Sequence, residues 1–440
     1  MANIAPGKIE QTEFEAVTCP ACGLLCDDIS IKALADGNLK VSQNACAKSI
    51  QFFERPIRLS EPKIAGKTVS PDAAIAKASE LLARSAHPLI AGLGAEVQGM
   101  RAIMSLADHI GASLDHMNST ASLRNTLVIQ NSGWQVCTLT EVRNRVDLLV
   151  IIGTDVVSLF PRFFERVVWN KESMFDQDTS SREIVYLGGS NINTAPGISP
   201  DGRKPTVLPC DQARLPEVVA TLRALVAGKK LVAEEVAGIA VSDLAKLAER
   251  LHAAKYSVIA WAAAALDFPH AELTVQNIAE TVVTLNKKTR SSGLPLAGNE
   301  ADLTANQVST WTSGYPVRNS FIHSYPEYSP YQFGTEQLLD NNEADVLVWI
   351  SSLNPEKLPP TSKLPTIVIG HPDLQLTSEP DVFIPVGIPG IDQKGTMFRS
   401  DNVVSLPLSQ LRNTALPSLQ SVIAAIEASV RSAATNLKDN

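Results

Sequence analysis

The sequence has few of the features that mark membrane proteins and nucleic-acid-binding proteins. Its longest nearly uncharged apolar stretches, such as 148–152 and 258–265, are far shorter than the ~20 residues needed to cross a bilayer. Lysine and arginine total 38 against 46 acidic residues, a formal charge of −8, and aromatic residues make up only 5%. No basic run is interleaved with aromatic residues. We therefore expect neither a membrane span nor a nucleic-acid partner.

A secretory signal is also missing from the beginning of the sequence. Glu10, Glu13 and Glu15 occupy the region where a signal peptide would have a basic start followed by an apolar run. The chain has only six cysteines in 440 residues. In a reducing compartment, clustered thiols more often bind metal or act in catalysis than form disulfides. These observations predict a cytoplasmic protein.

Short apolar runs alternate with amphipathic helical patterns along most of the chain. Ser70 and Pro71 provide the N-cap and the first position of one helix. An apolar run at 88–92 precedes a helical pattern at 96–109. Further strands are expected at 146–153, 183–188, 256–261, 344–350, 365–369 and 381–385, and a terminal helix at 416–434. This alternation predicts an α/β fold with layered parallel sheets.

Composition divides the chain into segments. The first combines most of the cysteines with a short hairpin whose turn, 36–38, reads Asp-Gly-Asn and tolerates positive φ. Proline and glycine are frequent at 188–209 and 293–330, which marks long connections where domains can meet. The expected segments are a cysteine-rich cap (1–60), two α/β lobes (61–200 and 201–330) and a part that completes the preceding lobes and ends in a helix (331–440).

Four cysteines form the strongest motif. Cys19, Cys22, Cys26 and Cys46 follow the pattern C-x2-C-x3-C-x19-C. A C-x2-C turn directs two sulfurs toward one metal site, and the other two complete a four-sulfur set. The x3 spacing and the distant fourth cysteine favour a [4Fe-4S] cluster over a zinc ribbon, whose ligands usually form two matched pairs. A zinc site or an empty structural knot is the alternative.

The remaining motifs are weak. Gly92, Gly94 and Gly99 follow an apolar run, but their spacing differs from G-x-G-x-x-G, and a tight strand-to-helix turn explains them without a phosphate. Cys137 and Cys210 stand alone and are interpreted as small buried hydrophobic residues. The metalloprotease, nucleophile-elbow and P-loop motifs are absent, and the seven histidines are scattered. The sequence predicts no self-contained hydrolytic site.

Further groups of residues match one known family in the same order along most of the chain. They are Asp27-Asp28-Ile29 after the first three cysteines; Asn44-Ala45-Cys46-Ala47-Lys48; Asn144-Arg145-Val146-Asp147 and Phe160-Pro161-Arg162; Asn306-Gln307-Val308 with Trp311-Thr312-Ser313-Gly314-Tyr315-Pro316; and Ile384-Pro385-Val386, Gly390, Gly395-Thr396, Arg399 and Asp401-Asn402. The chain thus resembles the B subunit of formylmethanofuran dehydrogenase, in the molybdopterin oxidoreductase superfamily. The resemblance implies a formate-dehydrogenase-like fold, with Lys48 between an iron–sulfur cluster and a pterin.

Two departures from the family pattern change the implied function. Redox-active relatives carry a Cys-His pair, whose thiolate or selenolate binds tungsten or molybdenum, ahead of Ala-Ile-Gln. Here 128–130 reads Val-Ile-Gln, and counting back places Ala121 and Ser122 at the pair. The stretch 296–298 also lacks an arginine that relatives carry. The chain is therefore most similar to the family branch found in the formyltransferase/hydrolase complex of methylotrophic bacteria.

That resemblance implies formyl transfer without redox chemistry. The complex would move a formyl group from formyl-tetrahydromethanopterin to a methanofuran-like carrier and hydrolyse it to formate during formaldehyde oxidation. A hydrolase-like A subunit and a formyltransferase D subunit would perform the chemistry, and a C subunit would accompany them. The chain itself would be a structural subunit with no catalytic residue and no molybdopterin or tungstopterin.

Two alternatives stay open, and with them the question whether the chain is itself an enzyme. It can be the B subunit of an active formylmethanofuran dehydrogenase, with a tungsten or molybdenum pterin for the interconversion of CO2 and formylmethanofuran. That function requires a substitute metal ligand, for which only His116 and Cys137 lie near enough in the sequence. The other alternative is a different complex-bound iron–sulfur or zinc protein that serves electron transfer or docking.

Overall fold

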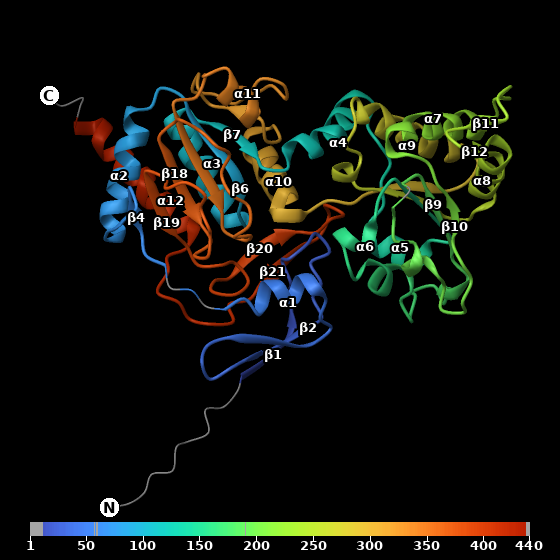
Figure 1. The fold of residues 1–440 in the computed structure, drawn as a ribbon, viewed down its shortest axis with the longest axis horizontal. Coiled ribbons are helices and arrows are strands. Elements are labelled where there is room, and N and C mark those ends of the chain that lie inside the picture. The colour runs from blue at the N-terminus through green and yellow to red at the C-terminus, as the bar shows by residue number, and fades with distance from the viewer. Residues whose placement is uncertain (1–11, 57, 59, 190, 437–440) are drawn as a thin grey trace, which may run out of the picture. The chain divides into compact units, whose positions relative to one another are not determined.

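The computed structural model describes residues 12–56, 58, 60–189 and 191–436 (Figure 1). The chain forms two compact units. The first comprises the residues up to Ser119, Gly298–Phe398 and the residues from Ser405 onward. The second comprises Thr120–Ala297 and Arg399–Val404. Each unit is built around its own sheet, so that the chain has two separate hydrophobic cores.

A nine-stranded mixed sheet forms the centre of the first unit. Its strands are β4 (Lys63–Ile64), β5 (Lys67–Thr68), β6 (Pro88–Gly94), β7 (Ser113–His116), β15 (Asn319–Ser320), β16 (Glu327–Tyr328), β17 (Val346–Ser351), β18 (Thr366–Gly370) and β19 (Val382–Pro385). They are ordered β16-β15-β7-β6-β17-β18-β19-β4-β5. Pairing is parallel from β7 to β19 and antiparallel at both ends. The central strands are almost entirely buried, as expected for a parallel sheet covered on both faces.

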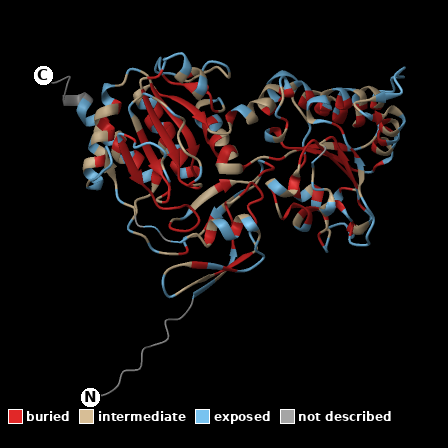
Figure 2. Cartoon of the chain, viewed as in Figure 1, coloured by how far each residue is buried: buried red, intermediate tan, exposed pale blue. Residues whose placement is uncertain are grey.

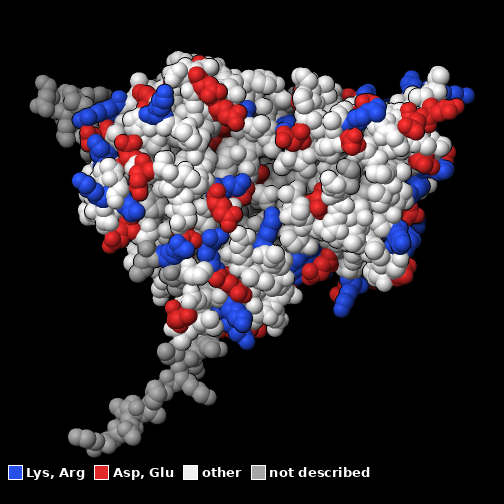
Figure 3. All heavy atoms as spheres, in the orientation of Figure 1, with Lys and Arg blue, Asp and Glu red and all other residues white. Residues whose placement is uncertain are grey.

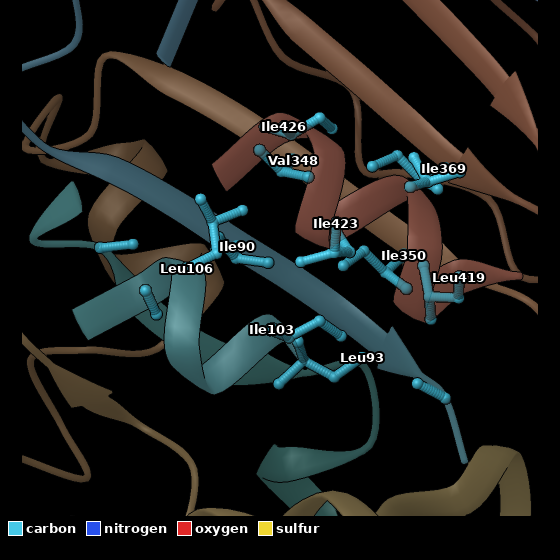
Figure 4. Close-up of a cluster of buried hydrophobic side chains, with 14 of the residues drawn as sticks. Ile90, Leu93, Ile103, Leu106, Val348, Ile350, Ile369, Leu419, Ile423 and Ile426 are labelled. Atoms are coloured by element: carbon cyan, nitrogen blue, oxygen red, sulfur yellow. The ribbon is translucent and has the colours of Figure 1, made fainter. Parts of the chain in front are cut away.

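Helices cover both faces of this sheet. They are α2 (Pro71–Arg84), α3 (Val97–Ile110), α10 (Asp302–Ser313) and α12 (Leu419–Asn436) on one face and α11 (Thr335–Asp340) on the other. Successive strand residues point to opposite faces. Ile90 and Ile350 pack against α3 and α12 (Figure 4). Leu89 and Trp349 share the opposite cluster with Leu338 of α11. The unit therefore has three layers.

The first unit also contains two smaller sheets. The N-terminal one is antiparallel, in the order β1 (Thr12–Val17), β2 (Ile29–Ala33), β3 (Leu39–Gln43), and is followed by α1 (Ala47–Phe53). Gly37, with φ of 83°, lies in the β2–β3 turn, which confirms the hairpin expected from the Asp-Gly-Asn sequence. The other is the antiparallel pair β20 (Gly395–Phe398) and β21 (Ser405–Leu408).

The second unit contains a five-stranded parallel sheet. Its main elements are α4 (Ser119–Asn131, with Ser119 in the first unit), α5 (Leu139–Arg145), β8 (Leu148–Ile152), α6 (Val156–Leu159), β9 (Glu183–Leu187), β10 (Thr206–Leu208), α7 (Leu215–Val226), β11 (Glu235–Val236), β12 (Ile239–Ala240), α8 (Val241–Ala253), β13 (Ser257–Trp261), α9 (Ala271–Leu285) and β14 (Ser291–Pro295). The sheet order is β10-β9-β8-β13-β14. Side chains from α7, α8 and α9 pack with Val150 and Ile259. Buried residues are concentrated along the strands of the large sheets (Figure 2).

The α/β fold predicted from the sequence is confirmed, with antiparallel strands added at the edges of the larger sheet. The units differ from the expected segments, because 61–200 and 201–330 each contribute to both units. The reason is long-range pairing: β6 pairs with β17, far along the chain. No helix in the described ranges combines the length and apolar composition needed to cross a bilayer. On the face shown in Figure 3, basic and acidic side chains are interspersed.

Candidate functional site

Three of the four motif cysteines lie in the turn between β1 and β2. Cys19, Cys22 and Cys26 are each buried, with 5%, 6% and 5% exposure. The Cys19 N–H donates to the Cys26 carbonyl at 2.8 Å, which closes the loop. Cys46 is the N-cap of α1, and its sulfur accepts from the Ser49 N–H at 3.5 Å. Local backbone structure thus holds each of the four sulfurs within the first unit.

The four thiols affect one another electrostatically. Burial raises the pKa of Cys19 well above its usual value, and the charges of Cys22, Cys26 and Cys46 raise it further. Burial also raises the pKa of Cys22 to about 12, although the nearby charge of Lys48 acts in the opposite direction. Cys22, Cys26 and Cys46 are thus close enough to Cys19 for their charges to act on it, and no disulfide joins any of the six cysteines. A metal centre would have to displace protons from these thiols.

The spacing of these side chains bears on the kind of metal centre. Within residues 12–436, leaving aside 57, 59 and 190, no group of three or more histidine, cysteine, aspartate or glutamate side chains is arranged to hold a metal ion. A tetrahedral zinc site has Zn–S distances of ~2.3 Å, which requires sulfurs about 4 Å apart. The four-cysteine metal site therefore stays a prediction from the sequence.

A second polar cluster lies where the parallel strands of the nine-stranded sheet end. Open α/β sheets commonly bind ligands at the carboxyl ends of their strands. Here the carboxylate of Glu300 accepts from the side-chain amides of Asn118, after β7, at 2.9 Å and Asn354, after β17, at 3.0 Å. Lys357 Nζ lies 4.0 Å from the same carboxylate. We call these four residues the Glu300 cluster. Sequence reasoning did not identify it.

The backbone around Glu300 is strained and touches the cysteine loop. Gly298, Glu300 and Ala301 have φ of 98°, 49° and 62°, and the left-handed region costs a non-glycine residue about 1 kcal/mol or more. A Cβ on Gly298 would lie 2.7 Å from the Cα of Gly23, between Cys22 and Cys26. The segment that carries Glu300 is therefore packed directly against the loop that carries the cysteines.

Asp302, at the start of α10, gives this segment a pH dependence. Burial raises the pKa of its carboxyl from 3.8 to about 7, although the N–H groups of Leu303 and Gly298 donate to it. The folded state thus holds a proton that the unfolded state releases above pH 4. Stability from this group is present below that pH and is lost as the pH rises to about 7, by at most about 4 kcal/mol.

The variant Asp302→Asn should therefore raise the unfolding midpoint more at pH 8 than at pH 5, where wild-type Asp302 is already protonated. Thermal unfolding of wild type and variant at both pH values measures this difference. Asp72→Asn, at an exposed position in the first turn of α2, is the control and should show no such pH dependence of its own. An equal effect of Asp302→Asn at the two pH values would contradict the buried, protonated carboxyl.

Comparison with known proteins places this geometry in context. No protein-family model matches the chain. It is 27% identical over 403 residues to the B subunit of tungsten-containing formylmethanofuran dehydrogenase 2 from Methanocaldococcus jannaschii, covering 88% of this chain and 91% of the relative. The corresponding protein of Methanococcus maripaludis is 26% identical over 407 residues, with coverages of 89% and 92%.

The chain is also similar to a B subunit from a second kind of complex, at comparable identity but over less of its length. The chain is 28% identical over 337 residues to the B subunit of the formyltransferase/hydrolase complex Fhc from Methylorubrum extorquens, covering 76% of this chain and 87% of that subunit. A chain in the crystal structure of the FhcABCD complex from that organism, in complex with methylofuran, matches with a TM-score of 0.72 at 26% identity. The match covers 85% of this chain and 99% of that chain. This chain is a homologue of the B subunits of both kinds of complex. The resemblance inferred from the sequence is confirmed.

Ala121 and Ser122, the positions at which we expect the metal-binding pair from the sequence, lie in the first turn of α4, and both side chains are partly buried. Ala121 offers only a methyl group at this place. An alanine has no atom that can bind tungsten or molybdenum, and a neutral hydroxyl such as that of Ser122 is not the soft ligand that a thiolate provides.

Both candidate substitute ligands are engaged in other contacts. His116 Nδ1 accepts from the Asn118 N–H at 2.9 Å, which leaves Nε2 to donate to the Glu300 carbonyl at 3.1 Å. Burial lowers the pKa of His116 to about 4, so that the ring is neutral. Cys137 donates to the Gly293 carbonyl at 3.5 Å, and burial raises the pKa of its thiol. Neither side chain presents an atom to a metal without breaking these contacts.

Several residues from the motifs noted in the sequence have structural roles here. The carboxylate of Asp147 accepts from two backbone N–H groups, those of Lys255 and Tyr256, at 2.7 and 3.0 Å, and so positions the start of β13. Asp401 accepts from the Leu139 N–H at 3.0 Å at the start of α5. A Cβ on Gly92 would lie 2.5 Å from the Ile350 carbonyl oxygen, so that close strand packing accounts for this glycine.

Proposed function

We propose that the chain is a non-redox structural B subunit of a formyltransferase/hydrolase complex. The observation that carries the proposal is that both ring nitrogens of His116 are in hydrogen bonds, while Ala121, at the position where we expect the ligand from the sequence, has no atom that can bind tungsten or molybdenum. Similarity to the Fhc B subunit over 87% of that subunit's length supports it. The fold would then be retained from molybdopterin oxidoreductases while the redox centre is lost.

In this proposal the chain assembles with three other subunits. The related crystal structure is of the FhcABCD complex with methylofuran. A hydrolase-like A subunit and a formyltransferase D subunit would convert formyl-tetrahydromethanopterin to formate through a methanofuran-like carrier, and a C subunit would accompany them. The chain would hold these subunits together and contribute no catalytic residue.

We infer that the four motif cysteines, three in the β1–β2 turn and Cys46 at the start of α1, hold a [4Fe-4S] cluster rather than a single zinc ion. The charges of neighbouring thiols raise the pKa of Cys19 and Cys22, and no three of the four sulfurs are arranged around one metal ion in the described part of the chain. Cys19, Cys22, Cys26 and Cys46 would each bind a different iron atom, which allows a wider separation than a single ion does. Such a cluster can transfer one electron when bound. In a non-redox subunit its role would be to stabilise the loop.

A second candidate function is that of the B subunit in an active formylmethanofuran dehydrogenase. The two tungsten-containing relatives favour it, because they match 88% and 89% of this chain, against 76% for the Fhc B subunit. The chain would then require a pterin-bound tungsten or molybdenum with no ligand from His116, Cys137 or Ala121. Counting the tungsten and molybdenum atoms bound per chain separates the two functions.

The decisive experiment is elemental analysis of the anaerobically purified native complex, with its copurifying subunits identified by mass spectrometry. We expect less than about 0.1 tungsten or molybdenum atom per chain, about four iron atoms per chain, and copurification of formyltransferase and hydrolase-like subunits. One tungsten or molybdenum per chain would contradict the structural role and support the dehydrogenase. Absence of both enzyme subunits would contradict membership of the formyltransferase/hydrolase complex.

A further inference from the structure

The second unit contains a basic cavity that is independent of the cysteine loop and of the Glu300 cluster. Its volume is about 270 Å³. It lies at the amino ends of β9 and β10, and its walls include Arg182, Glu183, Ser199, Arg203, Lys204 and Arg250. We call this space the basic cavity.

The charges around the basic cavity are unbalanced. Glu183 is the one carboxylate in its wall, and Arg250 already binds it through Nε at 2.9 Å and Nη2 at 2.6 Å. Among the described residues, no carboxylate lies within ion-pair distance of Arg182, Arg203 or Lys204. Asp201 is near enough for the charge of Arg203 to contribute to lowering its pKa, but a hydrogen bond from Ser199 is the main cause. Counting Asp201 as well, four cations face two carboxylates.

Arg182 is the least compensated of these cations. It is only 1% exposed, yet all of its hydrogen bonds go to neutral groups. Nη1 donates to the Val168 carbonyl and Asn170 Oδ1 at 2.5 and 3.1 Å, and Nη2 donates to the Arg143 carbonyl and Gln177 Oε1 at 2.7 and 2.8 Å. Its Nε has no partner in the described part of the chain. Burial lowers the pKa of the guanidinium to about 10, so that it stays charged at neutral pH.

A buried charge without a counter-ion is unfavourable unless an anion compensates it. The neutral contacts fix the Arg182 guanidinium in place. Arg203 Nη2 donates to the carbonyls of Ser180 and Arg182 at 2.6 and 2.9 Å, which positions this second guanidinium at the cavity wall. The exposed side chain of Lys204 can move toward a ligand. Arginine binds phosphate and carboxylate groups through paired donors. The cavity lies just below the usual size range for drug-sized ligands, so it admits a small molecule.

We propose that the basic cavity binds a small oxyanion that carries two or more negative charges, of the phosphate or polycarboxylate class. Arg203 and Lys204 bind it directly, and the fixed charge of Arg182 stabilises it. The basic cavity shares no lining residue with the cysteine motif or with the Glu300 cluster. The proposal thus stands or falls independently of the proposed function.

The test is isothermal titration of the intact chain with inorganic pyrophosphate and, separately, with citrate, in buffers of matched ionic strength. We expect saturable binding of at least one probe. The tighter of the two identifies the phosphate or the carboxylate class. Arg203→Gln combined with Lys204→Gln should weaken that binding at least tenfold. Both side chains are exposed, but Arg203 also donates to the Ser180 and Arg182 carbonyls, so thermal unfolding of the double variant is measured alongside. Lys204→Gln alone, which breaks neither of these hydrogen bonds, should weaken the binding in the same direction.

The matched control removes the same charge from the same unit. Lys287→Gln combined with Lys288→Gln changes two exposed lysines that do not line the cavity. This control should bind the probe as tightly as wild type. Equal weakening in both double variants, or no saturable binding of either probe, would overturn the proposal. Binding to the separated chain but not to the assembled complex would also overturn it, because a partner subunit would then fill the cavity.

Discussion

Replacing Cys22 with serine is expected to remove most of the iron from the purified chain and to expose the segment around β1–β3 to solvent. Cys22 is 6% exposed and lies in the loop that joins β1 to β2. Most residues of β1 are exposed, and the buried aliphatic residues of this three-stranded sheet are Val17, Ile29, Ile31, Leu39 and Val41. A core of this size leaves room for a bound metal to contribute to stability. Metal binding can supply folding free energy directly. We expect a local loss of roughly 3 kcal/mol or more, measured by amide hydrogen exchange over residues 12–56.

The matched control is Cys210→Ser. Cys210 is also buried, at 5% exposure, but it lies in the second unit and outside the cysteine motif. This variant should retain its iron and should leave exchange in the first unit unchanged. If Cys22→Ser kept both its iron content and its exchange protection, neither a metal centre nor a stabilising role at these cysteines would be tenable.

Gly298→Ala is expected to destabilise the first unit by roughly 2–4 kcal/mol. The new Cβ would lie 2.7 Å from the Cα of Gly23, and contact between two backbones cannot be relieved by turning a side chain. The φ of 98° adds strain, because side-chain-bearing residues rarely adopt it. The two backbone segments would have to move apart, and this would displace the loop that carries Cys19, Cys22 and Cys26 together with Glu300. Chemical denaturation, analysed for the first unit, measures the loss.

Gly314→Ala separates the two contributions to this loss. Gly314 ends α10 with φ of 86°, but no atom lies within 4 Å of a Cβ built there. Gly314→Ala should therefore lower the free energy of unfolding only through backbone strain, by about 1 kcal/mol. Equal losses in the two variants would show that the close approach of Gly298 to Gly23 contributes nothing to stability.

Local sequence signals were sufficient to predict many of the helices and strands of the fold. The N-cap at Ser70 and the proline at Pro71 predicted the start of α2, and short apolar runs predicted the central strands. The strand β7 was missed, because its sequence Ser-Leu-Asp-His is short and polar. It is a strand only because it pairs with β6 on one side and with Asn319 and Ser320 on the other.

The two candidate sites also differ in how far their residues lie apart in the sequence, and therefore in how well they could be predicted. The cysteine motif is confined to a short stretch of sequence, so its neighbourhood was predictable. The Glu300 cluster was not, because its partners Asn118 and Asn354 lie 182 and 54 residues away. The segment 296–298 was noted only for the arginine it lacks. Its glycine is explained by the approach of Gly23, a contact between distant parts of the chain.

The discontinuity of the first unit has a consequence for protein synthesis. Strand β6 ends at Gly94, and its parallel partner β17 begins at Val346, roughly 250 residues later. At about 5–20 residues per second, the ribosome needs about 12–50 s to supply that partner. During this time one hydrogen-bonding edge of β6 lacks its partner strand, whereas the residues of the second unit up to Ala297 are synthesised before β17. Until β17 emerges, β7 is the only one of the two strand neighbours of β6 that has already been synthesised.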